Sequence, residues 1–345
     1  MTVSYRYIGN KTRLLEQLIP HISSEVSTGA TVVDLMCGTA SVAEALRVNK
    51  FKVIASDIMT FARHHATVRL LLNASPDFKG MGGANYADLL QELNSIAPRE
   101  GFFFREFSPD GAPLNGERSR QYFSSANASK IDAISKTMNA WRDSKRITEI
   151  ENSLLRHDLV LGANRVANIA GTYGHYRSKW NKSAANDLEL FPSTFITDPN
   201  INHTVIQGAA EDVSSQIQAD LCYIDPPYMK RQYAANYHVI ETIARGDEPL
   251  AVGVSGLREW RDQYSNFCSK VKIRDSFRQI FTSMQCPKFL ISYSEDGLLS
   301  KNELVELFSE FGSVRVSELN YQRFKSNKGG QGGKLNEYVF RLIKN

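Results

Sequence analysis

Cysteine is scarce in this sequence of 345 residues. The four cysteines, Cys37, Cys222, Cys268 and Cys286, form no C-x-x-C pair, which argues against a zinc knuckle and against a disulfide framework. Long apolar runs are also missing, because no stretch approaches the roughly 18 apolar residues that a transmembrane helix needs. The first residues lack the apolar core of a signal peptide. We therefore expect a cytoplasmic protein with no membrane partner and no bound metal.

A strong imbalance of charge is absent as well. The net charge is +4, with 42% hydrophobic and 23% charged residues, which is near the average for a globular chain. These values exclude disorder, collagen and coiled coil as descriptions of the whole chain. They permit a polyanionic partner without requiring one. The length predicts two domains or one elaborated domain.

Helices and short strands alternate in two separated parts of the sequence. Between residues 1 and 75, strands are predicted at 31–34 and 52–57, each ending in an acid and followed by a helix. The alternation returns from residue 203, with strands predicted at 204–207, 221–224, 288–292, 314–319 and 337–343. This order is typical of a parallel sheet covered by helices. We therefore predict one discontinuous α/β domain formed by residues 1–75 and 203–345.

The stretch from 76 to 202 contains few convincing strands and reads as a mostly helical insertion. Two sets of apolar residues recur at helical spacing. The first set is Ile131, Ile134, Met138 and Trp141, and the second is Ile147, Ile150, Leu154 and Leu161.

The most informative motif is Asp225-Pro226-Pro227-Tyr228, directly after an apolar strand. Two prolines cannot continue a sheet, so they hold the Asp225 side chain and the following carbonyl at the carboxyl edge, where open α/β sheets bind ligands. Two acceptors there can each take one hydrogen of an aromatic amino group and free its lone pair for attack on a methyl donor. Tyr228 offers a face on which a base can stack. The alternative is a simple turn that ends a strand.

A strand, a glycine turn and a helix follow one another around Asp34 and Gly38, and the next strand ends in Asp57. Only one glycine is present, so this is not the G-x-G-x-x-G turn of a nicotinamide-dependent oxidoreductase. Acids at both strand ends suit the hydroxyl groups of an adenosine-bearing ligand without phosphates, such as S-adenosylmethionine. The alternative is that both acids only cap the helices that follow.

The turn Gly9-Asn10-Lys11 precedes the first predicted helix. A glycine, an amide and a cation at a helix start suit a carboxylate, and the methionine end of that donor has one. A surface turn with a solvated lysine explains these residues equally well.

Together, these motifs resemble a known family. The order of Tyr7–Lys11, Asp34–Gly38, a long insertion and Asp225–Tyr228 is similar to the alpha group of adenine-specific DNA amino-methyltransferases, which includes the Dam-like enzymes. Residues 231–243, 292–299 and 336–340 resemble most the branch that contains the FokI-type modification methylases. The resemblance extends over nearly the whole chain.

The resemblance implies a Rossmann-like, S-adenosylmethionine-dependent methyltransferase sheet with a mostly helical target-recognition insertion at 76–202. It implies that Asp225, Pro226, Pro227 and Tyr228 act on the adenine. The residues that it assigns to the donor are Tyr7, Gly9, Asn10, Lys11, Asp34, Cys37, Gly38, Thr39, Asp57 and Asp212.

The sequence departs from the family pattern at three places. Ala40 replaces the second glycine of the turn after the first strand, and Asn10 replaces a glycine. Ala209 stands where an acid that contacts the adenine of the donor is common, with Glu211 and Asp212 close by.

Local charge supports DNA as the partner. No acid occurs from Leu159 to Asn186 or from Tyr321 to Lys334, and basic residues alternate with aromatic ones in the first window. Such a pattern suits phosphate contacts and stacking, although most charge runs are solvated surface. The predicted DNA contacts are Arg165, Tyr173, Arg177, Lys179, Arg231, Tyr233, Asn236, Arg323 and Lys325. His238 is interpreted as structural or DNA-contacting because the chemistry needs no general base.

We therefore predict a sequence-specific adenine methyltransferase that acts on a base flipped out of double-stranded DNA. The resemblance further implies the modification enzyme of a restriction-modification system, with a cognate restriction endonuclease acting separately. Two alternatives stay open: the same chemistry on RNA adenine or DNA cytosine, and a non-catalytic DNA-binding module on this fold.

Overall fold

The computed structural model describes residues 6–116, 118–198, 202–322 and 334–345, and it divides into two compact units. The first, which we call the sheet unit, consists of Gly9–Leu71, Asp198–Tyr233 and Gln263–Asn345. The second, the helical unit, consists of Met1–Ile8, Leu72–Thr197 and Ala234–Asp262. The segment 234–262 thus packs with the insertion, whereas the predicted domain boundaries place it in the catalytic region. The functional boundaries themselves stay a prediction.

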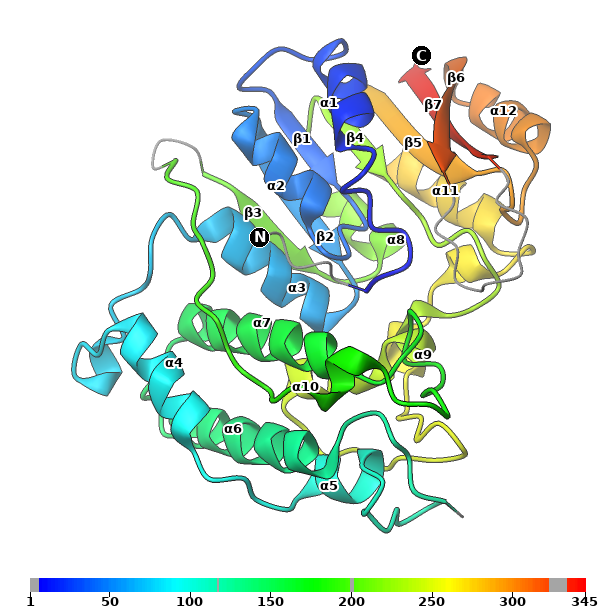
Figure 1. Ribbon diagram of the computed structural model, residues 1–345. Coiled ribbons are helices and arrows are strands. Elements are labelled where there is room, and N and C mark those ends of the chain that lie inside the picture. Colours follow the sequence, from blue (N-terminus) through cyan, green and yellow to red (C-terminus); the bar gives the residue numbers. More distant parts are fainter. Residues whose placement is uncertain (1–5, 117, 199–201, 323–333) are drawn as a thin grey trace. The chain divides into compact units, whose positions relative to one another are not determined.

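A seven-stranded sheet with the order β3-β2-β1-β4-β5-β7-β6 forms the centre of the sheet unit (Figure 1). The strands β3, β2, β1, β4 and β5 are parallel, and β7 is antiparallel to both of its neighbours, β5 and β6. The chain builds outward from β1 through β2 to β3 and then returns to the other side of β1 with β4. Their bounds are β1 Thr31–Asp34, β2 Lys52–Asp57, β3 Thr204–Gln207, β4 Leu221–Ile224, β5 Lys288–Ser294, β6 Gly312–Gln322 and β7 Lys334–Lys344. This reversal between β1 and β4 is a topological switch point, where open α/β sheets bind ligands.

Helices cover both faces of the sheet because neighbouring residues of the central strand point to opposite sides. Val32 packs with Leu18 and Leu46 on one face, and Val33 packs with Phe277 on the other. The helices of the sheet unit are α1 Leu15–Ser23, α2 Ser41–Val48, α3 Thr60–Ala66, α8 Ala210–Val213, α11 Ile273–Ser283 and α12 Lys301–Ser309. The predicted Rossmann-like α/β class is therefore confirmed.

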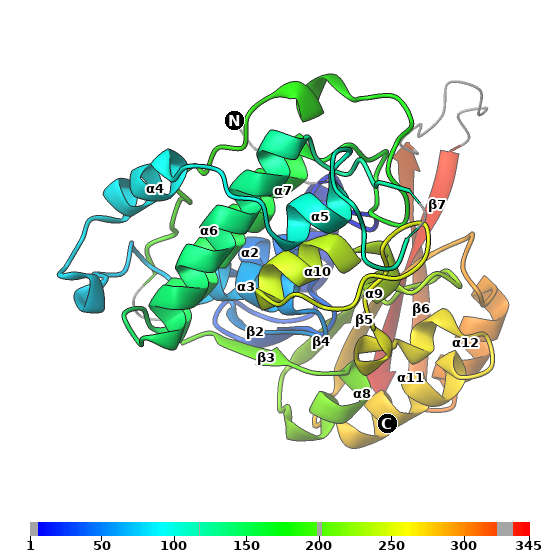
Figure 2. The ribbon, with the colours of Figure 1, turned by 90° about the horizontal axis from the view of Figure 1, so that it is seen from below.

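The helical unit is built around α6 and α7, which run side by side (Figure 2). Thr148 and Glu151 form a capping box at the start of α7, and Arg156 of α7 donates to the carbonyl of Ile243 on α10 at 2.9 Å. The helices are α4 Tyr86–Ser95, α5 Phe102–Phe107, α6 Ser125–Asp143, α7 Glu149–Val166 and α10 His238–Arg245, while α9 comprises Tyr233–Asn236. Helix α10 lies on α7, which explains why 234–262 belongs to this unit.

The first predicted apolar stripe is buried along α6. In the second stripe, Leu154 is fully buried but Ile150 is 42% exposed, because it lies in the first turn of α7. None of the helices in the described part of the chain combines the length and the hydropathy of a bilayer-spanning segment.

Candidate active site

The proline corner lies directly after the fully buried strand β4. Asp225 follows the last strand residue, Ile224, at the carboxyl edge beside the switch point. The carbonyl of Tyr228 accepts a hydrogen bond of 3.0 Å from the amide of Leu298, and the Tyr228 ring meets Tyr293 edge to face at 6.1 Å. These contacts fix the end of the motif, so the corner is held at both sides.

Lys11 pairs with the carboxylate of this corner. Its Nζ lies 3.0 Å from Oδ1 of Asp225 and 2.6 Å from Oε1 of Glu337, and the Lys11 residue is 5% exposed. Glu337 lies on β7, and its Oε1 also accepts a hydrogen bond of 2.7 Å from the hydroxyl of Ser292 on β5. Two carboxylates therefore share one buried cation, and β5 and β7 hold the second carboxylate in place.

The charges of this cluster shift one another's pKa. Burial raises the pKa of Asp225 to about 6, although the ammonium of Lys11 acts in the opposite direction. Burial alone would lower the pKa of Lys11, but the carboxylates of Asp225 and Glu337 raise it well above its usual value. Lys11 is therefore charged at neutral pH, and Asp225 is ionised above about pH 6. An ionised carboxylate only accepts hydrogen bonds, so Asp225 can serve as an acceptor at this edge.

The glycine turn after β1 joins the ends of two strands. Gly38 has φ +50°, and its amide donates to Oδ2 of Asp57 at 2.8 Å, while Oδ1 of Asp57 accepts from the amide of Met59 at 2.8 Å. Asp34 accepts from the amide of Ala43 on α2 at 3.0 Å. Asp34 thus contacts the first turn of α2, whereas Asp57 contacts the amides of Gly38 and Met59 in the turns that precede α2 and α3. A carboxylate accepts up to about four hydrogen bonds, so this role is compatible with ligand binding.

Ala40, which stands where the family pattern has a second glycine, has a left-handed backbone conformation. Its φ is +57° and its side chain is fully buried, which is unusual for a residue with a Cβ atom. Ala40 thus adopts here a left-handed conformation that glycine adopts without strain.

Three acids lie at this edge: Asp34 and Asp57 end β1 and β2, and Asp225 follows β4. Burial and then the charge of Asp225 raise the pKa of Asp34 to about 8. Among the described residues of this edge, the acids outnumber the buried cations, and Lys11 already has two carboxylate partners. Such a set of residues suits a cationic, adenosine-bearing ligand without phosphates, which is the chemistry of S-adenosylmethionine.

Comparison with known proteins agrees with this geometry. Residues 7–318 match the family of D12 class N6 adenine-specific DNA methyltransferases. The chain belongs to this family. The resemblance seen in the sequence is thereby confirmed, and S-adenosylmethionine is the methyl donor.

Several type II modification methylases are similar to this D12 class chain. It is 32% identical over 325 residues to the type II methyltransferase M.NlaIII of Neisseria lactamica, covering 93% of each protein. It is 30% identical over 343 residues to M.CviAII of Paramecium bursaria Chlorella virus 1, covering 97% of each. It is 32% identical over 349 residues to the type II methyltransferase M.FokI of Planomicrobium okeanokoites. This match covers 98% of the present chain but only 52% of M.FokI.

The other residues predicted to contact the donor differ in burial and in the unit to which they belong. Gly9 has φ +83° and lies close to the hydroxyl of Tyr233, and Oδ1 of Asn10 accepts from the amide of Thr12 at 2.9 Å. Cys37 and Thr39 are buried in the turn after β1. Tyr7 belongs to the helical unit, where its ring stacks on Tyr237 at 4.6 Å, and Asp212 is exposed on α8. Donor binding by these residues stays a prediction.

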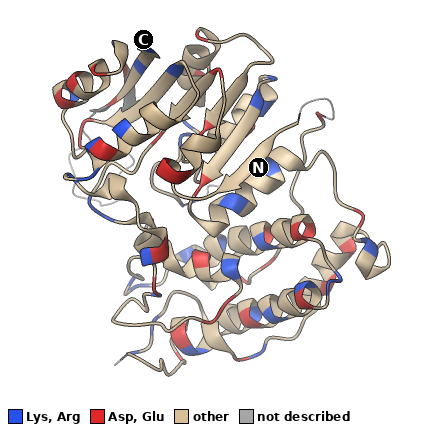
Figure 3. Cartoon of the chain, turned by 180° about the vertical axis from the view of Figure 1, so that it is seen from behind, with Lys and Arg blue, Asp and Glu red and all other residues tan. Residues whose placement is uncertain are grey.

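The predicted DNA contacts differ in exposure. Arg177 and Lys179 are exposed in the helical unit, and Arg231 is exposed in the sheet unit. The guanidinium of Arg165 lies 4.5 Å from the ring centre of Phe191. Lys and Arg are present in both units, mixed with Asp and Glu (Figure 3). Arg323 and Lys325 lie outside the described residues.

Tyr173 is fully buried, in contrast to the surface position that the prediction requires. Its ring stacks on Tyr122 at 6.2 Å, and its amide donates to the carbonyl of Asn236 at 2.7 Å. In this conformation it presents no face to a ligand. Tyr233 and Asn236 are half-buried. His238 is fully buried with its Nε2 atom 3.0 Å from the carbonyl of Tyr173, which fits the structural interpretation.

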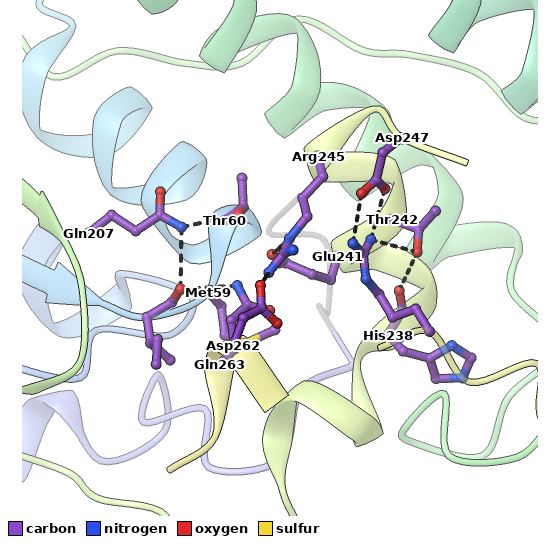
Figure 4. A network of polar contacts seen from close by, with 12 residues as sticks. Met59, Thr60, Gln207, His238, Glu241, Thr242, Arg245, Asp247, Asp262 and Gln263 are labelled. Carbon is purple, nitrogen blue, oxygen red and sulfur yellow. Dashed lines mark hydrogen bonds and ion pairs between the residues drawn. The ribbon is translucent and has the colours of Figure 1, made fainter. Parts of the chain in front are cut away.

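Sequence reasoning did not find three residues of this site. Glu337 and Ser292 support Lys11, as described above. Gln207 is the last residue of β3 and pairs in register with Asp57 of β2. Its Nε2 donates to the carbonyl of Ile58 at 3.3 Å and to Oγ1 of Thr60 at 3.1 Å (Figure 4). The signal that could have found it is its place at a strand end beside an acid.

The Lys11 cluster predicts a shift in pH dependence. In Glu337→Gln, the negative charge that raises the pKa of Asp225 is removed, while the shape of the side chain is kept. We expect the acidic limb of the methylation rate to move to lower pH, by a few tenths of a unit to about one unit. The measurement is the single-turnover rate between pH 5 and 8. Glu318→Gln, an exposed acid on β6, is the control, and a limb that stays in place or moves upward contradicts the assignment.

Proposed function

We propose that this chain transfers a methyl group from S-adenosylmethionine to the exocyclic amino group of an adenine flipped out of double-stranded DNA, at a specific sequence. The observation that carries the proposal is the proline corner: Asp225 lies at the carboxyl edge of the sheet, at the switch point, and is paired with the buried cation of Lys11. Membership in the D12 class supports adenine and DNA as target and substrate.

The chemistry requires few protein groups. S-adenosylmethionine, when bound, supplies an electrophilic methyl group on a sulfonium. The Asp225 carboxylate and the Pro226 carbonyl accept the two hydrogens of the adenine amino group, so that its lone pair points at the methyl carbon. Tyr228 stacks on the base. The donor would give up the methyl group by loss of its C–S bond and leave as S-adenosylhomocysteine, and Asp225 or water would take the proton that the methylated nitrogen releases. Preorganised acceptors of this kind each contribute a factor of about 100 to 1000.

We further propose that the protein acts in the cytoplasm as the modification enzyme of a restriction-modification system, with the endonuclease as a separate protein. The names of M.NlaIII and M.CviAII as type II methyltransferases support this role, since the chain covers most of each of them.

The direct test is sequencing that detects modified adenines in DNA from cells that express the protein. We expect N6-methyladenine at one short sequence and none in cells without the protein. Modification of RNA or of cytosine instead would support the alternative substrates. Donor binding without any modification would support a non-catalytic DNA-binding module.

The mechanism predicts that Asp225→Ala abolishes methyl transfer and leaves donor binding within about threefold of wild type, because Asp225 acts on the base. Calorimetric titration with S-adenosylhomocysteine measures the binding. Asp275→Ala, which removes an exposed acid of α11, is the control. An equal loss of binding and activity would instead assign Asp225 to the donor site or to the fold.

In the family, an acid that contacts the adenine of the donor is common at the position of Ala209. We propose that Gln207 makes this contact here. The strand ends β4, β1, β2 and β3 form a row, so a donor whose reactive end faces Asp225 and whose ribose faces Asp57 has its adenine toward β3. A backbone carbonyl only accepts hydrogen bonds, so the amide group of Gln207 must turn its nitrogen to Ile58. Its oxygen is then directed elsewhere and can accept a hydrogen bond from the adenine amino group.

This assignment predicts that Gln207→Leu weakens the binding of S-adenosylhomocysteine about three- to tenfold, as expected for one hydrogen bond. S-inosylhomocysteine lacks the amino group, so its affinity should not change. Calorimetry of both ligands on both proteins measures the difference. Equal losses for the two ligands would show that Gln207 does not read the amino group.

The basic window predicts that charge reversal at Arg177 and Lys179 weakens DNA binding without changing donor affinity. Each lost phosphate contact also lowers the slope of log affinity against log salt concentration by about one. Fluorescence anisotropy with a labelled duplex at several salt concentrations measures both effects. If affinity and slope stay at their wild-type values, these two residues do not contact DNA.

A further inference from the structure

A short hairpin in the helical unit exposes apolar side chains. Val252 and Leu257 exchange two backbone hydrogen bonds of 2.9 and 2.8 Å, and Gly253 and Gly256, with φ +69° and +67°, close the turn between them. The turn residue Val254 is 73% exposed. Leu250 is 63% exposed and Val252 is 44% exposed. Burying such residues in a partner removes their apolar surface from water, so this exposure indicates a binding surface.

The hairpin is held on a buried arginine. Arg120 is 0% exposed, and its Nη2 donates to the carbonyls of Gly253 at 3.0 Å and Asn115 at 3.2 Å, while its Nη1 pairs with Glu106 at 2.7 Å. A Cβ atom on Gly256 would lie 2.8 Å from the ring of Phe107, so the turn packs tightly against this support. Leu114, 69% exposed, precedes Asn115, whose carbonyl accepts from the same Arg120 nitrogen as the carbonyl of Gly253.

A second arginine holds the base of the hairpin. Arg258 follows Leu257, and it forms a two-pronged ion pair of 2.8 and 2.7 Å with Asp247 and donates to the hydroxyl of Thr242 at 3.1 Å (Figure 4). The apolar tip is therefore presented by an ordered support rather than by a free loop.

The residue after Arg120 connects the same support to the basic window. Nε2 of Gln121 donates to the carbonyls of Arg177 at 2.6 Å and Ser178 at 2.8 Å. Arg120 thus contacts the hairpin, and Gln121 contacts the segment that carries the exposed Arg177 and Lys179. The apolar hairpin and these two cations lie on connected loops of one unit.

The charges around the hairpin indicate the chemistry of the partner that it would bind. The window from Leu159 to Asn186 has no acid. Three of the four acids that flank the hairpin have cationic partners: Asp247 pairs with Arg258, Glu259 with Arg261, and Asp262 with Arg245. Arg177 and Lys179 have no carboxylate partner among the described residues, and an apolar tip near such cations fits a polyanion with an apolar interior, which is the chemistry of stacked bases between phosphates.

We propose that the hairpin from Val252 to Leu257 enters double-stranded DNA as an apolar wedge, with Val254 at its tip, while Arg177 and Lys179 contact the phosphates. This inference rests on the proposed function. Flipping a base breaks its stacking and leaves a gap in the duplex. An apolar side chain that fills the gap stabilises the flipped state, as wedges do in other DNA-bending proteins.

The test uses the duplex that contains the methylated sequence found by sequencing, and a second duplex with an abasic site opposite the target adenine. Single-turnover methylation is measured for wild type, for Val254→Ser and for the matched control Val271→Ser, a valine 84% exposed in the sheet unit. An adenine opposite an abasic site has no pairing partner, so flipping it out of the duplex costs less free energy. We expect Val254→Ser to slow methylation of the paired duplex about tenfold and of the abasic duplex less than about twofold.

Two results would overturn the wedge: an unchanged rate on the paired duplex, or an equal loss on both duplexes, which is the pattern of a misfolded or generally weakened protein. Val271→Ser should match wild type on both. A wild-type protein that methylates no adenine in DNA would contradict the proposed function itself, whereas normal wild-type methylation with an unaffected Val254→Ser would contradict the wedge alone.

Discussion

The buried ion pair between Lys11 and Asp225 is the interaction on which the candidate active site depends. Losing Lys11 would leave the carboxylates of Asp225 and Glu337 buried without their cation, and breaking a buried ion pair in this way costs about 3–5 kcal/mol. Asp225 must stay ionised to accept hydrogens from an amino group, yet burial works against that charge. Lys11 resolves this conflict, and Glu337 and Ser292 position Lys11. The site therefore includes the turn before α1, the end of β4 and the pair β5–β7.

The strand order places this ion pair next to the acids that end the neighbouring strands. Because β1 lies between β2 and β4, the acids that end these three strands form one row at the carboxyl edge. The row connects the residues predicted to hold the donor with the residues predicted to hold the base. In the proposed function, the sheet arranges an adenosine-bearing cation and an aromatic amine along this edge.

Much of this arrangement could be predicted from sequence, because strand ends are local features. Asp34, Asp57 and Asp225 each follow a short apolar run, and parallel strands must bring their carboxyl ends to one edge. Glu337 could not be found in this way, since its position depends on the insertion of antiparallel β7 between β5 and β6. Tyr173 was misleading because aromatic and basic residues alternate on a surface and around a core alike, and only packing separates the two. The packing of residues 234–262 with the insertion also depends on contacts between segments that are far apart in the sequence, such as those of α10 with α7.

The central claim is that the proline corner presents two oxygens to an adenine amino group. A crystal structure of the protein with S-adenosylhomocysteine and a duplex that contains the target site tests it most directly. The account predicts the amino nitrogen within hydrogen-bonding distance, about 3 Å, of both the Asp225 carboxylate and the Pro226 carbonyl. An adenine bound with its amino group directed away from this corner would contradict the account.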